Sequence, residues 1–290
     1  MTFPFPLTFM QVSGVVVPDL DGSTPVAAFS TSRLRLTSYA GNPIIRMRRS
    51  SDNAESDFGV TALNKLDVDA IATWLGADTG FLVTMYNQTG TGVDHLTQAT
   101  TTAQPTYDPS VAAINGVPAF LNDGGDVLAG TNPLTAAVVG FSAYITLLST
   151  VSGSDAVWSI GNFAGSASNL IINTSTEVTI YRKRIATIGD ATTAAGDGLV
   201  TGVPSMFEIR EIANDSRDLW LNGVQVATDA TSVVGSPAAF TGMRTAQYDS
   251  TVPMPGYITD IAVFDDQITD AIRNQIGAGA AYYGATVAPV

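Results

Sequence analysis

Short stretches in which apolar and polar residues alternate recur along the chain, and this pattern predicts many β-strands. The clearest is 218–227, where two alternating runs flank Asn222-Gly223. That pair tolerates positive φ at both positions, so it predicts a hairpin closed by a type I′ turn. The other expected strands are 44–48, 81–86, 141–148, 156–160, 170–172, 178–181, 206–212 and 257–264.

Two segments have the spacing of amphipathic helices. The first is 66–78, with apolar residues at Leu66, Ile71, Trp74 and Leu75. Asp67 and Asp69 are expected in its first turn, where the helix dipole favours anions, and Gly76 is expected to end it. The second is 267–283, whose apolar residues include Ile268, Ile272 and Ile276. The chain therefore combines many strands with one or two short helices.

The composition supports an all-β fold. Gly occurs 27 times, and Asn-Gly or Asp-Gly pairs suited to tight turns recur. No period of 20–50 residues repeats, which argues against a solenoid or propeller. We therefore expect a β-sandwich or barrel over 26–290 as one domain. The Pro-rich residues 1–25 are either an extended arm or a frayed terminus.

The charge balance excludes several classes of function. The chain of 290 residues has 13 Lys+Arg against 26 Asp+Glu, a net charge of -13. This argues against nucleic-acid binding, and no apolar stretch is long enough for membrane insertion. Cysteine is absent, which excludes disulfides and Cys nucleophiles, and the single histidine, His95, excludes a metal site of several imidazoles.

Five arginines lie close together in the sequence between residues 26 and 60, and they allow two interpretations. They either form a basic binding face or pair with nearby acids such as Asp52, Glu55 and Asp57. The negative net charge favours the second interpretation. The five are Arg33, Arg35, Arg46, Arg48 and Arg49.

Few residues carry recognisable chemistry. His95 beside Asp94 is either part of a Ser-His-Asp arrangement or, as we favour, a loop residue that orients a turn. The acidic loop 122–126 offers Asp123 and Asp126 as oxygen ligands for Ca²⁺, although the EF-hand spacing is absent. No other cofactor is expected.

The stretch from about 141 to 284 resembles the LamG or concanavalin A-like jelly roll. The resemblance rests on LWLNGVQVA, on YITDIAVFDDQITD and on the closing Tyr282-Tyr283-Gly284. It implies a sandwich in which the hairpin and the long strand are followed by a short final helix.

The stretch from about 27 to 105 resembles the N-terminal part of the fungal arabinofuranosidase B catalytic domain. The matching segments are AAFSTSRLRLTSYAGNPIIRMRRSSDNAESDFGV and FLVTMYNQTGTGVDHLTQA. That domain is itself a concanavalin-like sandwich. The two resemblances together imply one all-β, concanavalin A-like jelly-roll β-sandwich with one or two short helices.

The catalytic carboxylates of that family are not matched. The family's nucleophile is a Glu near a Gly-Asn pair beside vicinal cysteines, and alignment on Gly161-Asn162 places it at Ala164. The family's Asp in a Tyr-Asp-Gln loop is Asn87 here. The chain has four glutamates, and alternation predicts that Glu208 and Glu211 lie on a solvated face. We therefore expect no catalytic residues and no enzymatic activity.

Similar stretches occur in phage virion proteins, so the first hypothesis is a non-enzymatic virion protein, a head decoration, spike or tail fibre. It would assemble in the host cytoplasm into the virion, as a homo-oligomer in contact with other capsid or tail subunits. It would bind host surface glycans through Tyr86, Asn87, Asp94, His95, Trp158 and Asn162. The alternatives are an arabinofuranosidase-like glycoside hydrolase acting on host polysaccharide and a free carbohydrate-binding module.

Overall fold

The computed structural model describes residues 15–90, 94–134, 140–150, 155–161, 168–173, 178–184, 187–192, 199–212, 217–229, 242–245 and 254–290. Strands dominate this part of the chain. They are β1 (Ala27–Ser30), β2 (Ile45–Arg49), β3 (Glu55–Phe58), β4 (Gly80–Met85), β5 (Leu96–Thr97), β6 (Thr106–Val111), β7 (Val117–Asn122), β8 (Ala129–Thr131), β9 (Gly140–Ser149), β10 (Asp155–Gly161), β11 (Ser168–Asn173), β12 (Val178–Arg184), β13 (Thr187–Thr192), β14 (Ser205–Ile212), β15 (Arg217–Leu221), β16 (Val224–Asp229), β17 (Gly242–Thr245) and β18 (Gly256–Phe264).

The helices are few and short. They are α1 (Val68–Leu75), α2 (Asp270–Ala280) and the 3-10 turns η1 (Thr37–Tyr39), η2 (Thr101–Ala103), η3 (Ala112–Ile114) and η5 (Ala281–Tyr283). Neither described α-helix has the length and apolar character needed to cross a membrane. The expected all-β class is therefore confirmed.

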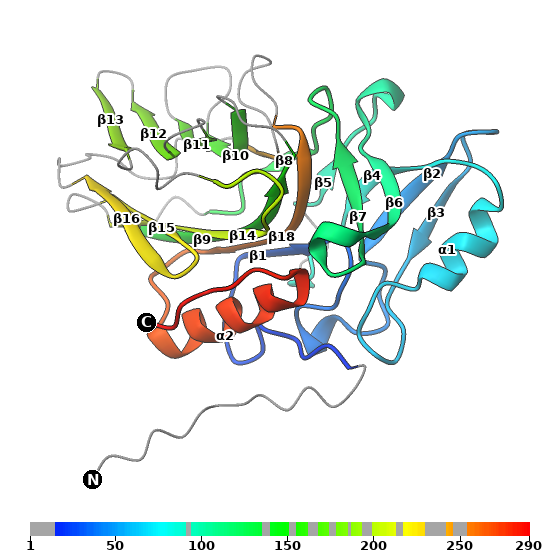
Figure 1. Ribbon diagram of the computed structural model, residues 1–290, viewed down its shortest axis with the longest axis horizontal. Helices are drawn as coiled ribbons and strands as arrows, with labels where there is room; N and C mark the ends of the chain where they lie inside the picture. The colour runs from blue at the N-terminus through cyan, green and yellow to red at the C-terminus, as the bar shows by residue number, and fades with distance from the viewer. Residues whose placement is uncertain are drawn as a thin grey trace, which may run out of the picture.

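The strands form two stacked layers joined at one side (Figure 1). One layer follows the pairing order β16–β15–β14–β9–β18–β1, and the other follows β13–β12–β11–β10–β17–β8. Strands β7, β6, β4 and β5 link the two layers, and β2 and β3 extend from β4. Each of these pairings is antiparallel. Large apolar side chains such as Trp158, Phe207 and Leu219 form the buried core.

The predicted hairpin is present. Asn222 has φ 51° and Gly223 has φ 82°, the two positive values that a type I′ turn requires. The backbone N–H of Ala288 donates to the carbonyl of Asn222 at 2.8 Å. A Cβ at Gly223 would lie 2.0 Å from the carbonyl oxygen of Ala288, so only glycine fits there. The sequence pattern did not predict β1, β3, β5, β6, β7, β8, β13 and β17, of which β5, β8 and β17 are too short to show alternation.

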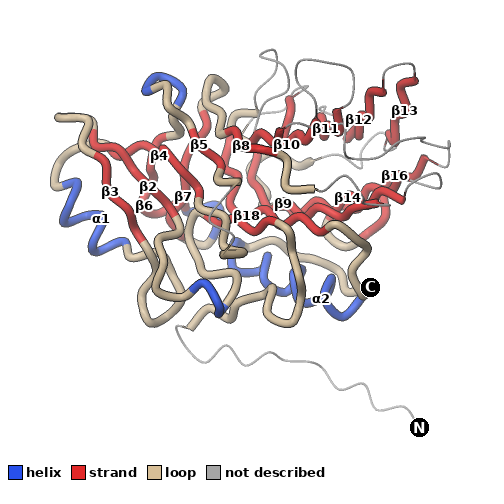
Figure 2. The backbone as a smooth tube through the Cα atoms, turned by 180° about the vertical axis from the view of Figure 1, so that it is seen from behind, coloured by secondary structure: helices blue, strands red, loops and turns tan. Residues whose placement is uncertain are grey.

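Both predicted helices are present, but each is shorter than its pattern. The Asp67 carboxylate accepts a hydrogen bond from the N–H of Ala70 at 3.0 Å, so Asp67 is the N-cap of α1 rather than a first-turn residue. Gly76 ends α1 with φ 60°. α2 covers the outer face of the layer that contains β9 and β14 (Figure 2).

Strand β18 is buried along its whole length, although its sequence alternates. It pairs with β1 on one side and with β9 on the other. Its polar residues Thr259 and Asp260 are at most 2% exposed, and each has partners: Thr259 donates to the carbonyl of Thr146 at 3.1 Å. Alternation here therefore marks paired polar groups and not a solvated face.

Four buried charged residues, Asp19, Arg33, Arg35 and Asp260, form what we call the ion quartet. Arg33 Nε donates to Asp260 at 2.9 Å, and its Nη2 donates to Asp19 at 2.7 Å and also to Asp260. Arg35 Nε donates to Asp19 at 2.7 Å. The hydroxyl of Tyr283 donates to Asp260 at 2.7 Å. All four charged side chains are at most 3% exposed, and their formal charges cancel.

Two of the three remaining clustered arginines, Arg46 and Arg49, pair with nearby acids as we favoured, whereas Arg48 binds uncharged partners. Arg46 binds Asp57 through two hydrogen bonds of 2.7 and 2.8 Å. Arg49 binds Asp52 at 2.7 Å. Arg48 donates to the side chain of Gln104 at 2.6 Å. The cluster is therefore not a free basic face, and Arg33 and Arg35 pair with acids distant in sequence.

The prediction that Glu208 is solvated is wrong. Glu208 is 1% exposed, because α2 covers this part of β14. Its carboxylate accepts from Arg273 at 2.7 Å and from the hydroxyl of Tyr144 at 2.9 Å. The side chain of Glu211 lies outside the described residues.

The predicted boundary between an N-terminal segment, residues 1–25, and the domain, residues 26–290, stays a prediction. Within that segment, residues 15–25 are described, and Leu20 and Asp19 are buried. Asp19 belongs to the ion quartet, so this part of the segment contributes to the packing of the sandwich.

Asp260→Asn is expected to lower the free energy of unfolding by about 3 kcal/mol, because it leaves two buried guanidinium groups with one carboxylate. Burial alone would raise the pKa of Asp260, but Arg33 and Arg35 outweigh burial and lower it. The stabilisation is therefore complete above the unfolded pKa of about 3.9 and is lost as the pH falls through the lower folded pKa. Urea unfolding at pH 7 and pH 3 measures both effects. Asp265→Asn, at an exposed position, is the control and should cost less than about 0.5 kcal/mol.

Gly256→Ala is expected to destabilise far more than Gly22→Ala. Both glycines have positive φ, 146° and 85°. A Cβ at Gly256 would lie 2.2 Å from the carbonyl oxygen of Leu148, whereas one at Gly22 meets nothing within 4 Å. Thermal and urea unfolding should show a loss of about 1 kcal/mol for Gly22→Ala and about 3 kcal/mol or more for Gly256→Ala. Equal losses would contradict the close contact.

Candidate functional site

The ends of three neighbouring strands bring distant parts of the chain into one row, which we call the β10 rim. Gly161 at the end of β10 lies opposite Gly242 of β17, and Gly242 lies opposite Thr131 of β8. The hydroxyl of Thr131 donates to the carboxylate of Asp94. The segment before β5 therefore lies beside the strand end at which the Gly161-Asn162 pair occurs.

Tyr86, Asn87 and His95 meet next to this row. The rings of Tyr86 and His95 pack edge to face, with centroids 4.9 Å apart and planes 85° apart. The backbone N–H of Asn87 donates to Nδ1 of His95 at 3.1 Å. Together with Asp94, four of the six residues expected to bind glycan thus lie together.

The Asn87 side chain is used to hold the fold. It is 1% exposed, and its Oδ1 accepts from the N–H of Ala28 at 3.0 Å and from the N–H of Thr89 at 3.2 Å. Its Nδ2 is buried without a hydrogen-bond partner among the described residues. An amide in this position links β1 to the loop after β4 and has no acid or base function.

The sequence patterns did not indicate a second group of polar side chains beside Tyr86. The hydroxyl of Tyr86 donates to Asp57 at 2.7 Å, and Arg46 binds the same carboxylate. The hydrogen bond from Arg46 lowers the pKa of Asp57, so this half-exposed carboxylate is ionised at neutral pH. Burial and the hydrogen bond to Asp57 raise the pKa of Tyr86 to about 12. Only the pairing of β2, β3 and β4 reveals this group, and no local motif marks it.

His95 is neutral at pH 7. Burial lowers its pKa, and the carboxylate of Asp94 opposes that shift without cancelling it. The hydrogen bond from Asn87 to Nδ1 requires an unprotonated ring nitrogen, which agrees with the lowered pKa. The favoured interpretation of His95 as a residue that orients a loop fits these contacts, and a neutral imidazole also gives the rim an uncharged polar group.

The other two residues expected to bind glycan do not join this group in the described structure. Trp158 is fully buried in the core, opposite Thr245 of β17. Asn162 lies outside the described residues, and so does Ala164.

The loop with Asp123 and Asp126 lies beyond the other end of β8. Asp126 is 5% exposed and accepts a hydrogen bond from the N–H of Asp123 at 3.1 Å. Burial raises the pKa of Asp126, and the nearby Asp123 carboxylate adds to this shift. In the described part of the chain, no three His, Cys, Asp or Glu side chains gather as a metal site would require. Calcium binding at this loop stays a prediction.

Residues 19–139 match the family model described as "Alpha-L-arabinofuranosidase B, catalytic". No curated protein matches the chain in sequence. Among solved structures, an arabinofuranosidase complexed with arabinofuranosyl-α-1,2-xylobiose is 16% identical, with a TM-score of 0.65 over 91% of this chain and 64% of that one. A GH54 α-L-arabinofuranosidase soaked with a cyclic sulfate inhibitor is also 16% identical, with a TM-score of 0.63 over 91% of this chain and 64% of that one. The chain thus spans about 64% of the length of these structures, and they show its β-sandwich fold.

These findings overturn the first functional hypothesis. The prediction of a non-enzymatic virion protein is wrong, as are the associated assignments to phage, capsid decoration, head fibre and tail fibre. The matching family model and these structural neighbours are arabinofuranosidases, and nothing in them indicates a virion. The missing carboxylates at two positions misled the prediction, because they were given more weight than the match of the surrounding segments.

The single histidine allows a direct test of the rim. We expect the His95 imidazole to titrate below the usual value of about 6.5, because it is partly buried and accepts a hydrogen bond. Asp94→Asn should lower the pKa of His95 further by removing the opposing charge. NMR titration of the ring protons measures both values. A His95 pKa at or above 6.5 would show that the contact with Asn87 is absent.

Proposed function

We propose that the chain is a glycoside hydrolase of the arabinofuranosidase type that releases α-L-arabinofuranosyl groups from a polysaccharide. The observation that carries the proposal is the match of residues 19–139 to the catalytic domain of arabinofuranosidase B. The shared sandwich over 91% of the chain supports it.

The β10 rim is the proposed position of the reaction. The loop that contains Tyr86 and His95 belongs to the segment matched by the family model, and the pairing of β5, β8, β17 and β10 brings it to the end of β10. Tyr86 is half-buried, so part of its ring is available to a sugar. Aromatic faces pack well against the apolar faces of sugar rings.

Hydrolysis of a glycoside needs one carboxyl group that protonates the leaving oxygen and one carboxylate that attacks the sugar or activates water. Asn87 cannot take either role. Asp57, which binds the hydroxyl of Tyr86, is an ionised carboxylate and suits the second role. Asp94 lies beside the end of β10, where its carboxylate accepts from Thr131, and it is another candidate for the second role.

The test is cleavage of 4-nitrophenyl α-L-arabinofuranoside and of arabinan by the purified chain. We expect release of 4-nitrophenol and arabinose. Asp94→Asn and Asp57→Asn should each lower kcat about 100-fold or more, the usual effect of losing acid–base catalysis. Asp265→Asn removes one exposed carboxylate elsewhere and should leave kcat unchanged.

Absence of product from both substrates would overturn the proposal. Binding of arabinan without cleavage would instead identify a carbohydrate-binding module. Activity that survives both Asp substitutions would keep the hydrolase and move its acids to other carboxylates.

A further inference from the structure

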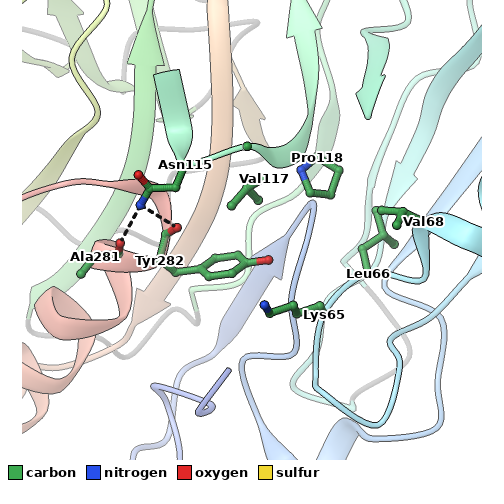
Figure 3. Close-up of a pocket in the computed structure, with 9 residues that line it drawn as sticks. Lys65, Leu66, Val68, Asn115, Val117, Pro118, Ala281 and Tyr282 are labelled. Carbon is green, nitrogen blue, oxygen red and sulfur yellow. Dashed lines mark hydrogen bonds between the residues drawn. The ribbon is translucent and has the colours of Figure 1, made fainter. Parts of the chain in front are cut away.

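A hollow of about 370 Å³ lies on the side of the molecule where α2 lies, whereas β8 and β10 lie on the opposite side (Figures 1 and 3). We call it the Lys65 pocket. Its volume is in the range of small-molecule sites. It is lined by Lys65, Leu66, Val68, Asn115, Gly116, Val117, Pro118, Ala281 and Tyr282.

The pocket is preformed by three segments that are far apart in the sequence. The side-chain amide of Asn115, in the turn between β6 and β7, donates to the carbonyls of Ala281 and Tyr282 at 3.4 Å (Figure 3). Lys65 is held by a β-bridge to Arg33. The backbone around the pocket is therefore fixed, and a ligand would bind without the cost of ordering a loop.

Lys65 gives the pocket an unpaired positive charge. Within the described part of the chain, its ammonium group has no carboxylate within 4.0 Å and no hydrogen-bond partner, and Nζ lies 6.0 Å from the centroid of the Tyr282 ring. The nearby carboxylate of Asp67 accepts from the N–H of Ala70.

Tyr282 adds a hydrogen-bond donor beside this cation. Its hydroxyl oxygen points into the hollow, and the hydroxyl has no partner among the described residues (Figure 3). Burial raises the pKa of Tyr282 to about 12, so the phenol keeps its proton at neutral pH. Leu66, Val117 and Pro118 provide apolar walls.

A cation and a neutral donor next to apolar walls fit a ligand with one carboxylate and a ring that has an apolar face. We propose that the Lys65 pocket binds a uronic acid unit, with its carboxylate at Lys65 and Tyr282 and its ring against Val117 and Pro118. The choice of a sugar among carboxylates rests on the proposed function, but the pocket is separate from the β10 rim and its binding requires no hydrolysis. It would hold an acidic polysaccharide to the protein.

The test is calorimetric titration with trigalacturonate and with its methyl ester, which lacks the charge. We expect trigalacturonate to bind at least tenfold more tightly than the ester. Lys65→Met should weaken the binding roughly tenfold and Tyr282→Phe roughly threefold, the usual effects of losing a charged and a neutral hydrogen bond. Lys183→Met removes the only other lysine, on β12, and should bind like the unchanged chain.

Equal binding of the ester, or full binding by Lys65→Met, would overturn the proposal. Displacement of trigalacturonate by sulfate at equal concentration would also overturn it, because the pocket would then select an anion and not a sugar. Lys65→Met and Tyr282→Phe should leave arabinofuranoside hydrolysis unchanged. A chain that binds trigalacturonate but cleaves no arabinofuranoside would therefore refute the proposed function alone. A chain that cleaves arabinofuranoside but does not bind trigalacturonate would refute only the proposal for the Lys65 pocket.

Discussion

The structure depends on the ion quartet, the buried set of two arginines and two aspartates. Moving such charges out of water is costly, and the cost is met only when every charge has its partners in good geometry. Arg33, Arg35, Asp19 and Asp260 largely meet this condition, with the Tyr283 hydroxyl as a further donor, although Nη1 of Arg33 is buried without a hydrogen-bond partner among the described residues. The set joins the segment before β1, the loop after β1, the central strand β18 and η5. Few other arrangements of these four elements could satisfy the same charges.

Both proposed sites are attached to this set. The side chain of Gln88 accepts from the N–H of Arg35 at 2.8 Å and donates to the carbonyl of Arg33 at 3.1 Å, so the loop with Tyr86 and Asn87 is fixed to it. On the other side, the β-bridge from Arg33 positions Lys65, and the Arg33 guanidinium lies 5.9 Å from the centroid of the Tyr282 ring. The ion quartet thus orients both the loop with Tyr86 and Asn87 beside the β10 rim and one wall of the Lys65 pocket.

Local patterns predicted both α-helices and ten of the eighteen described strands, and they predicted partners poorly. The Asn222-Gly223 hairpin follows from turn chemistry that needs no tertiary contact. The burial of Glu208 and of β18 could not be predicted, because it depends on α2 and on ions far away in the sequence. The hydrogen bond between Tyr86 and Asp57 depends on strand pairing in the same way. The functional class was misjudged because Asn87 and Ala164 record only what is absent, whereas the whole matched segment carries the likeness.

The distance along the chain between Arg33 and Asp260 has a consequence for biosynthesis. Their hydrogen bond joins residues 227 positions apart, and β1 completes the sheet only by pairing with β18. During translation Arg33 and β1 therefore reach their partners only after β18 has been synthesised. Such long-range closure slows folding and exposes unpaired strand edges in the meantime. The segment that carries the likeness to a catalytic domain therefore shares its sheet and its buried ions with the C-terminal strands.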